Sequence, residues 1–244
     1  MPPIAPHLLT GFSPIGLNEI SKVSLMDRVD TKFIFHFNKL ATILEKAASH
    51  YRILEVEGER MCNYKNLYFD TEDLRFYHDH HNGKKNRTKV RMRKYVESDI
   101  CYIEIKQKNN KGRTDKRRER IADFEKDTFK KSPLFLANHQ LYPVISNQFK
   151  RITLVSLSDT ERATFDLDLQ YTSEDTPLAF SNLVIAELKQ ATLNRKSKLL
   201  KILKKEAVNP FRISKYCMGM ALQNPALKSN AFKQKILRIN KITV

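Results

Sequence analysis

The sequence contains no tryptophan and only six glycines in 244 residues. Neither of the glycine-rich phosphate loops, GxxxxGK(S/T) or GxGxxG, occurs in it. Those loops bind phosphate through backbone N–H groups at the start of a helix. No Ser/His/Asp or Cys/His arrangement with a recognisable local context is present either. A phosphate ligand of this chain would therefore be held by side chains rather than by backbone amides.

Cysteine is also scarce, and long apolar runs are missing. Cys62, Cys101 and Cys217 are far apart and no CxxC pair occurs, which argues against a structural zinc site. No segment approaches the roughly 18 consecutive apolar residues that cross a membrane. The first residues lack the charged and apolar regions of a secretory signal. We expect a cytoplasmic protein with reduced thiols and no membrane segment.

The charge of the chain is strongly one-sided. There are 44 Lys and Arg residues against 27 Asp and Glu residues, which gives a net charge of +17. Such an excess indicates an anionic partner: a nucleic acid, a polyphosphate, a nucleotide or a membrane surface. Net charge alone does not choose among these partners. The hydrophobic content of 41% is sufficient for a core, so we expect a folded protein.

The basic residues alternate along several segments that are typical of strands. Lys89, Arg91 and Arg93 occupy every second position of TKVRMRKY, and Glu104 and Lys106 are likewise two residues apart. Successive side chains of a strand point to opposite faces, so each segment carries a column of charge on one face. A barrel with a charged interior would need this pattern on strands far apart in sequence. Two further segments show it: Arg28, Asp30 and Lys32, then Glu187 and Lys189.

A mixture of cations and carboxylates on inward strand faces has a chemical rationale. Several Lys and Arg side chains would bind a polyanion, and the bidentate geometry of arginine suits phosphate oxygens. Glu104 and Glu187 would reduce the repulsion among the cations, and could hold a divalent cation that bridges phosphate oxygens. The alternative is an exposed sheet face with ordinary salt bridges. Recurrence of the pattern on four strands favours the interior.

Periodicity and turn signals predict an α+β fold: a closed antiparallel β-barrel of about eight strands with helices packed outside. One domain would span 27–224, after a lead-in at 1–26 and before a basic tail at 225–244 with no clear period. Asn38 and Thr71 are expected to cap helices. Helices are expected at about 40–50, 71–77, 124–139, 195–206 and 214–223. Strands are expected at about 32–37, 51–57, 61–70, 87–97, 99–108, 113–122, 147–157, 161–171 and 181–191.

Five segments of the chain, in order, resemble a known family. They are NLYFDTEDLRFY, RTKVRMRKY, YIEIKQKNNKGRTDKRR, AELKQ and FRISKYCMG. Together they are similar to the VTC (vacuolar transporter chaperone) domain, the polyphosphate-polymerase branch of the CYTH-like triphosphate tunnel metalloenzymes. The resemblance extends from about Asp27 to Gly219. It implies a closed antiparallel tunnel lined with basic residues.

The resemblance also implies roles for the residues that match the family's motifs. Glu187 matches the metal-binding glutamate, and Glu104 is a second metal candidate because of its place among the cations. Lys215, Ser214 and Arg151 are the expected catalytic residues. Phe149 departs from the pattern, which has a tyrosine there that would donate a hydrogen bond to phosphate. Residues expected to bind the ATP, triphosphate or polyphosphate are Lys32, Arg91, Arg93, Lys106, Lys116, Lys189 and Arg212.

Members of this branch transfer the γ-phosphate of ATP to a growing polyphosphate chain with a divalent metal, Mn²⁺ or Mg²⁺. The resemblance therefore implies a polyphosphate polymerase with ATP as substrate. A metal-dependent inorganic triphosphatase is the second interpretation, and a non-catalytic polyanion-binding module is the third. We expect no nucleic-acid partner, because single-strand binding usually needs exposed aromatic rings. The aromatic residues here fall mostly within predicted strand cores: Phe33, Phe35, Tyr68, Phe69 and Tyr102.

Overall fold

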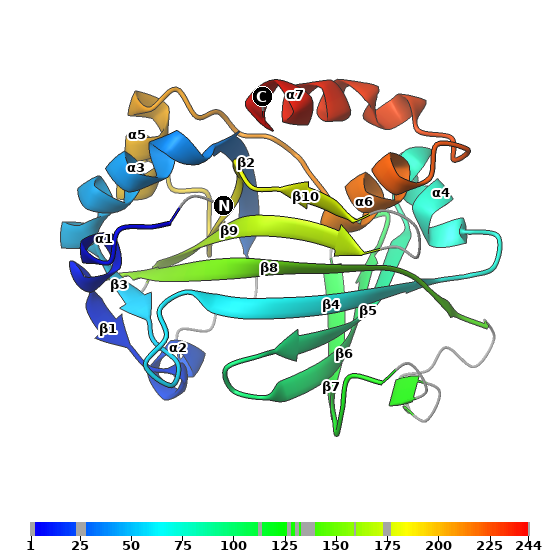
Figure 1. Cartoon of the computed structure of the whole chain (residues 1–244), viewed down its shortest axis with the longest axis horizontal. Coiled ribbons are helices and arrows are strands. Elements are labelled where there is room, and N and C mark those ends of the chain that lie inside the picture. The colour runs from blue at the N-terminus through cyan, green and yellow to red at the C-terminus, as the bar shows by residue number, and fades with distance from the viewer. Residues whose placement is uncertain are drawn as a thin grey trace.

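The computed structural model describes residues 3–22, 28–111, 114–125, 128–129, 132, 140–158, 160–172 and 177–243. One strongly curved β-sheet forms the body of the protein, and most of the helices lie against its outer side (Figure 1). The helices gather at the two ends of the long strands and along one edge (Figure 1).

Eight strands follow one another through the sheet, each antiparallel to its neighbours, in the order β2-β11-β9-β8-β4-β5-β6-β7. Short strands extend this path: β10 (Leu178–Phe180) pairs with β9, and β3 (Tyr51–Leu54) pairs with β8 and, in parallel, with β1 (Ser13–Ile15). The bounds of the eight are β2 Val29–His36, β4 Cys62–Asp70, β5 Arg87–Tyr95, β6 Ile100–Lys108, β7 Thr114–Ile121, β8 Tyr142–Ser156, β9 Glu161–Thr172 and β11 Leu183–Gln190.

The predicted antiparallel sheet with outer helices is confirmed, but the predicted closure of a barrel is not. Strands β2 and β7 are the two ends of the path, and no ladder joins them within the described residues. Within the described residues the sheet has eleven strands: the eight of the main path and the three short strands β1, β3 and β10. Curvature, rather than a complete ring of hydrogen bonds, brings the two end strands around one interior.

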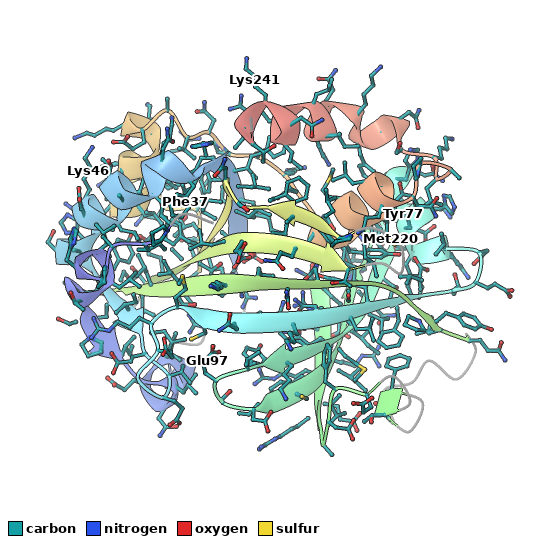
Figure 2. The ribbon with its side chains drawn as sticks, viewed as in Figure 1. Phe37, Lys46, Tyr77, Glu97, Met220 and Lys241 are labelled. Carbon is teal, nitrogen blue, oxygen red and sulfur yellow. The ribbon has the colours of Figure 1, made fainter. Side chains whose placement is uncertain are left out.

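Helices cover the outside of this sheet. Helices α3 and α5 pack on each other at one end of the long strands, while α4 and α6 pack at the other (Figure 1). Tyr77 of α4 and Met220 of α6 belong to the same buried cluster, whereas Lys241 of α7 points outward (Figure 2). The bounds are α1 His7–Thr10, α2 Leu17–Lys22, α3 Leu40–Ala47, α4 Arg75–His81, α5 Lys198–Lys205, α6 Lys215–Gln223 and α7 Lys233–Thr243, with 3-10 turns at Phe37–Lys39, Ala48–His50 and Asn230–Phe232.

Strand alternation separates an apolar face from a charged one. Val90 and Met92 of β5 pack with Ile103 and Ile105 of β6 in a buried cluster. The residues between them in sequence, such as Arg91, therefore project to the other face. A second cluster lies beneath α3 and α5, and a third beneath α6 and α7. Because the apolar faces meet the helices, the charged faces are left to line the concave side.

Two predicted helix starts are wrong. Asn38 does not cap a helix, because it lies inside the 3-10 turn Phe37–Lys39 that precedes α3. Helix α4 begins at Arg75 rather than directly after Thr71. Thr71 still serves the helix, since its Oγ1 accepts a hydrogen bond of 2.9 Å from the Arg75 N–H. The backbone turns between them at Leu74, which has a positive φ of 53°.

The C-terminal segment is more ordered than its sequence indicated. It forms α7, and three of its apolar side chains, Phe232, Ile239 and Ile242, are buried against the rest of the protein. The helix expected at 124–139 lies mostly outside the described residues. Within the described part of the chain, no helix has the length and apolar character needed to cross a membrane.

Helix α6 packs closely against the sheet at Gly219. A Cβ added there would lie 2.6 Å from Ile145 Cδ1 and closer still to the Tyr171 ring. We expect Gly219→Ala to lower the free energy of unfolding by about 2 kcal/mol, because β8 and β9 would have to move away from the helix. Urea unfolding measures this effect. Gly16→Ala is the control, since a Cβ there meets only a side-chain oxygen of Glu19 at 3.9 Å; equal stabilities of the two variants would contradict the close approach.

Candidate functional site

The concave side of the sheet encloses a cavity of about 210 Å³. Seven strands and the start of α6 contribute to its wall, so residues from most of the chain meet there. The wall is almost entirely polar and charged. Its residues are Arg28, Asp30, Lys32, Tyr68, Lys89, Arg91, Arg93, Glu104, Lys106, Lys116, Arg151, Glu187, Lys189, Ser214, Lys215 and Tyr216.

A row of three lysines crosses one side of the cavity. In the strand register, Lys89 of β5 lies opposite Lys106 of β6, and Lys106 lies opposite Lys116 of β7. Like charges directly opposite each other on a sheet repel and destabilise it. Burial, together with Lys32, Lys106 and Arg91, lowers the pKa of Lys89 to about 8. An anion bound along this row would relieve the repulsion.

Glu104 compensates part of this positive charge and is itself only 3% exposed. Its Oε2 lies 2.6 Å from Arg91 Nη2 and 3.8 Å from Arg93 Nη1, and its Oε1 lies 2.6 Å from Lys116 Nζ. Burial alone would raise the pKa of Glu104. The three cations outweigh burial and hold the pKa well below its ordinary value of 4.5, so Glu104 is an anion at neutral pH.

A second buried carboxylate, Asp166 of β9, lies behind the wall. Arg151 donates two hydrogen bonds to it, 2.5 Å from Nε to Oδ1 and 2.8 Å from Nη2 to Oδ2. Lys215 Nζ also donates to Oδ2. Burial would raise the pKa of Asp166, but Arg151 and Lys215 lower it far below the ordinary value. Asp166 thus joins two of the expected catalytic residues from different elements.

A third acidic group, Glu187, lies in the part of the cavity wall that β2 and β11 form. Glu187 of β11 lies opposite Lys32 of β2, and its Oε2 is 3.3 Å from Lys189 Nζ. Asp30 of β2 lines the same part of the wall and lies opposite Lys189 in the strand register. Burial alone would raise the pKa of Glu187. The charges of Lys189, Lys32 and Arg151 outweigh burial and hold the pKa well below its ordinary value.

The two neighbouring carboxylates fit a divalent cation better than Glu104 does. Mg²⁺ and similar ions are commonly held by one or two carboxylates together with substrate phosphates. Glu187 and Asp30 supply such a pair at the cavity wall. Both oxygens of Glu104 are already within 2.6 Å of a cation. Among the described residues, no group of three or more His, Cys, Asp or Glu side chains could hold a metal without other ligands.

The start of α6 closes one side of the cavity. Ser214 caps the helix, since its Oγ accepts a hydrogen bond of 3.3 Å from the Cys217 N–H. Lys89 Nζ donates to the same oxygen at 3.0 Å, and Lys32 Nζ donates to the Ile213 carbonyl at 3.2 Å. Helix N-termini favour anions, so the helix and the lysines attract the same ligand.

The structure brings together all of the predicted site residues except Arg212. That side chain is exposed and lies outside the cavity wall, because the neighbouring Ile213 turns inward to the core. Sequence reasoning missed Asp166, although Thr164, Asp166 and Asp168 alternate along ATFDLDL. Tyr68, which was expected in a strand core, is buried in a core cluster and also lines the cavity, a second role that the sequence did not indicate.

The ring of Phe149 contacts two cations of the cavity wall. Its ring centroid lies 4.5 Å from Lys215 Nζ and 5.1 Å from Arg151 Cζ. These are cation–π distances. The phenyl ring cannot donate a hydrogen bond to phosphate. It does contact Arg151 and Lys215, the two cations that Asp166 also binds.

The fold and the cavity together define a class of protein in which a curved antiparallel sheet surrounds a strongly basic interior. The VTC domain family model matches residues 27–224 of the chain. The protein belongs to the VTC domain family, and the resemblance seen in its sequence is thereby confirmed. No curated protein matches the chain.

Several solved structures are similar to this chain at low sequence identity. The Hippeastrum protein HpAC1, an adenylyl cyclase candidate described as having a dominant triphosphatase activity, is 15% identical with a TM-score of 0.51. The alignment covers 80% of this chain and 95% of that one. A candidate adenylate cyclase from Bacillus halodurans is 13% identical with a TM-score of 0.48, over 79% of this chain and 98% of that one. The protein PH1819 from Pyrococcus horikoshii is 14% identical with a TM-score of 0.47, over 80% and 99%.

Replacing Glu104 tests whether the empty cavity depends on its internal carboxylates. We expect Glu104→Gln to lower the free energy of unfolding by about 3 kcal/mol at neutral pH, because Arg91, Arg93 and Lys116 lose their common anion. The pKa of Glu104 is depressed in the folded protein. Its stabilising contribution is therefore complete above the ordinary pKa of 4.5, which the unfolded chain has, and is lost progressively as pH falls below that value.

Urea unfolding at pH 7 and at pH 3, with and without tripolyphosphate, measures both effects. Tripolyphosphate should reduce the difference from wild type, since the bound anion takes over the compensation. The exposed Glu72, changed to Gln, is the control. A Glu104→Gln variant as stable as this control at pH 7 would show that the carboxylate does not compensate the cavity.

Proposed function

We propose that the protein transfers the γ-phosphate of ATP to a growing polyphosphate chain inside the cavity. The main observation behind this proposal is the excess of basic over acidic residues in the cavity wall. The cavity wall presents ten Lys and Arg residues against three Asp and Glu residues, a formal balance of +7. One triphosphate carries about four negative charges, so the wall has positive charge left for a second anion. The VTC domain family, to which the chain belongs, supports the same reaction.

The proposed donor site lies between the fixed arginines. Arg91, Arg93, Arg151 and Lys106 would bind the triphosphate, and arginine can hold phosphate oxygens in bidentate geometry. Three of these side chains are oriented before any ligand arrives, because Glu104 binds Arg91, Asn66 Oδ1 accepts from Arg93 and Asp166 binds Arg151. Pre-organised cations of this kind stabilise charge in the transition state without reorganising during the reaction.

The proposed acceptor track uses the remaining lysines. Lys32, Lys89 and Lys116 would hold the polyphosphate chain, and Lys189 would lie next to the metal. Lys215 and Ser214, at the start of α6, would lie where the terminal phosphate of the chain meets the γ-phosphate. Arg212 has no part in this site, because it is outside the cavity wall.

Glu187, with Asp30, would hold the divalent cation. A bound Mn²⁺ or Mg²⁺ would neutralise charge on the phosphate oxygens. In the transfer, a terminal oxygen of the chain bonds to the γ-phosphorus, the bond from that phosphorus to the β–γ bridging oxygen breaks, and ADP leaves. Little covalent participation is needed, so the contribution of the protein is alignment and charge.

A metal-dependent triphosphatase is the second candidate. It is favoured by the shared fold with HpAC1, which is described as having a dominant triphosphatase activity. Water would then replace the polyphosphate chain as acceptor. The cations that bind the donor would be the same in both reactions, so the fate of the γ-phosphate is the distinguishing observation.

Product analysis with ATP labelled at the γ-phosphate separates these functions. With Mn²⁺ and a short polyphosphate primer, we expect the label to enter polymer and the primer to speed ATP consumption. Lys215→Met should abolish this transfer while triphosphate binding persists. Label found solely in orthophosphate would replace the polymerase by the triphosphatase, and no turnover with intact binding would leave a polyanion-binding module.

The proposed metal site makes a separate prediction. Glu187→Gln keeps the size of the side chain and removes its charge, so turnover at limiting Mn²⁺ should fall by about 100-fold. Titration of turnover with Mn²⁺ measures the effect, and the exposed Glu45, changed to Gln, is the control. An unchanged dependence on Mn²⁺ would rule out Glu187 as the ligand.

A further inference from the structure

We propose that Asp166 is a positioning residue that fixes Arg151 and Lys215 in one arrangement toward the cavity. This inference rests on the proposed function, in which both cations act on phosphate. Asp166 does not itself belong to the cavity wall, whereas both of its partners do. It therefore does not contact a ligand in the cavity, and it positions the two cations that do.

The contacts of Asp166 join three elements of the fold. The carboxylate belongs to β9, Arg151 to β8 and Lys215 to the first position of α6. The Arg151 bonds of 2.5 and 2.8 Å use both carboxylate oxygens in a fork, and Lys215 shares Oδ2. Asp166 is 3% exposed, so water does not compete for these bonds.

Aromatic rings fix the same cations from another direction. Arg151 Cζ lies 4.7 Å from the centroid of Tyr64 and 5.1 Å from that of Phe149. The Tyr64 and Phe149 rings stack on each other with centroids 5.4 Å apart. With one edge of the guanidinium bound by Asp166 and its face against these rings, Arg151 has a single orientation available.

The N–H groups of Arg151 and Lys215 that Asp166 does not bind are available to a ligand in the cavity. A guanidinium has five N–H donors and an ammonium has three. Asp166 takes two donors of Arg151 and one of Lys215. The remaining donors can reach a phosphate only from the cavity side. Without the carboxylate, the two cations would repel each other and lose this alignment, although the cavity would become more positive.

Loss of the Asp166 charge should change polyanion affinity and the rate of phosphoryl transfer in opposite directions, which makes the role testable. Removing the charge of Asp166 should strengthen the attraction of the cavity for a polyanion, because a nearby negative charge is lost. The same change should slow phosphoryl transfer, since that step depends on accurate placement of the reacting groups. A residue that merely stabilised the fold would not separate binding from turnover in this way.

The variant is Asp166→Asn, and Asp168→Asn is the matched control on the same strand. Asp168 has a positive φ of 52°, a conformation that asparagine tolerates, and it does not line the cavity. The first measurement is calorimetric titration with tripolyphosphate, which reports affinity and stoichiometry. The second is steady-state turnover of ATP with primer, which separates kcat from KM. Both are repeated in Lys215→Met and in the double variant.

We expect Asp166→Asn to bind tripolyphosphate at wild-type stoichiometry and about threefold more tightly. Its kcat should fall by about tenfold or more with KM unchanged or lower. In the Lys215→Met background, the same change should have a smaller effect on kcat, because one of its two targets is gone. Asp168→Asn should match wild type in every measurement.

Three results would overturn the assignment: kcat and KM equal to those of the control, weaker tripolyphosphate binding at full stoichiometry, or equal effects of Asp166→Asn with and without Lys215. A reduced stoichiometry would identify a folding defect and would also overturn it. If wild-type protein turns over no triphosphate at all, the proposed function fails on its own. The calorimetric comparison then still decides whether Asp166 modulates anion binding as described.

Discussion

The repulsion among cations enclosed by one curved sheet is the constraint on which the rest of the structure depends. Ten basic side chains share a cavity of about 210 Å³. Such a cluster is stable only if part of its charge is compensated within the fold. Glu104, Asp166 and Glu187 provide that compensation from three different strands. In the lysine row, Lys116 is paired with Glu104, whereas Lys89 donates to the neutral hydroxyl of Ser214 and is therefore more in need of an anion.

The carboxylates also divide the cations into two kinds. Arg91, Arg93 and Arg151 are held by a carboxylate, an amide or an aromatic ring, which fixes the direction of their remaining donors. Lys89 and Lys32 contact only a hydroxyl and a carbonyl in the described structure. Fixed arginines suit a donor whose γ-phosphate must be aligned, whereas flexible lysines suit a chain that must move. This division supports a transferase more than a simple binding protein.

Period-two alternation was sufficient to predict the inward faces of β5 and β6, because the opposite faces carry the buried apolar residues Val90, Met92, Ile103 and Ile105. For this reason Arg91, Arg93 and Lys106 could be placed in a common interior from sequence alone. Asp166 could not, since its role depends on the register between β8 and β9. Arg212 was assigned from the family resemblance rather than from alternation, and its exposed side chain lies outside the cavity wall. The gap between β2 and β7 has no sequence signal, and α7 was missed because only Ile239 and Ile242 mark its buried face.

The most direct test of the central claim is a crystal structure of the protein with tripolyphosphate and Mn²⁺. The account predicts a phosphate chain inside the curved sheet, with oxygens at hydrogen-bond distance from Arg91, Arg93 and Arg151, and with the metal between Glu187 and the phosphates. Tripolyphosphate bound on the outer surface, with the interior cations still paired only to Glu104 and Asp166, would contradict it.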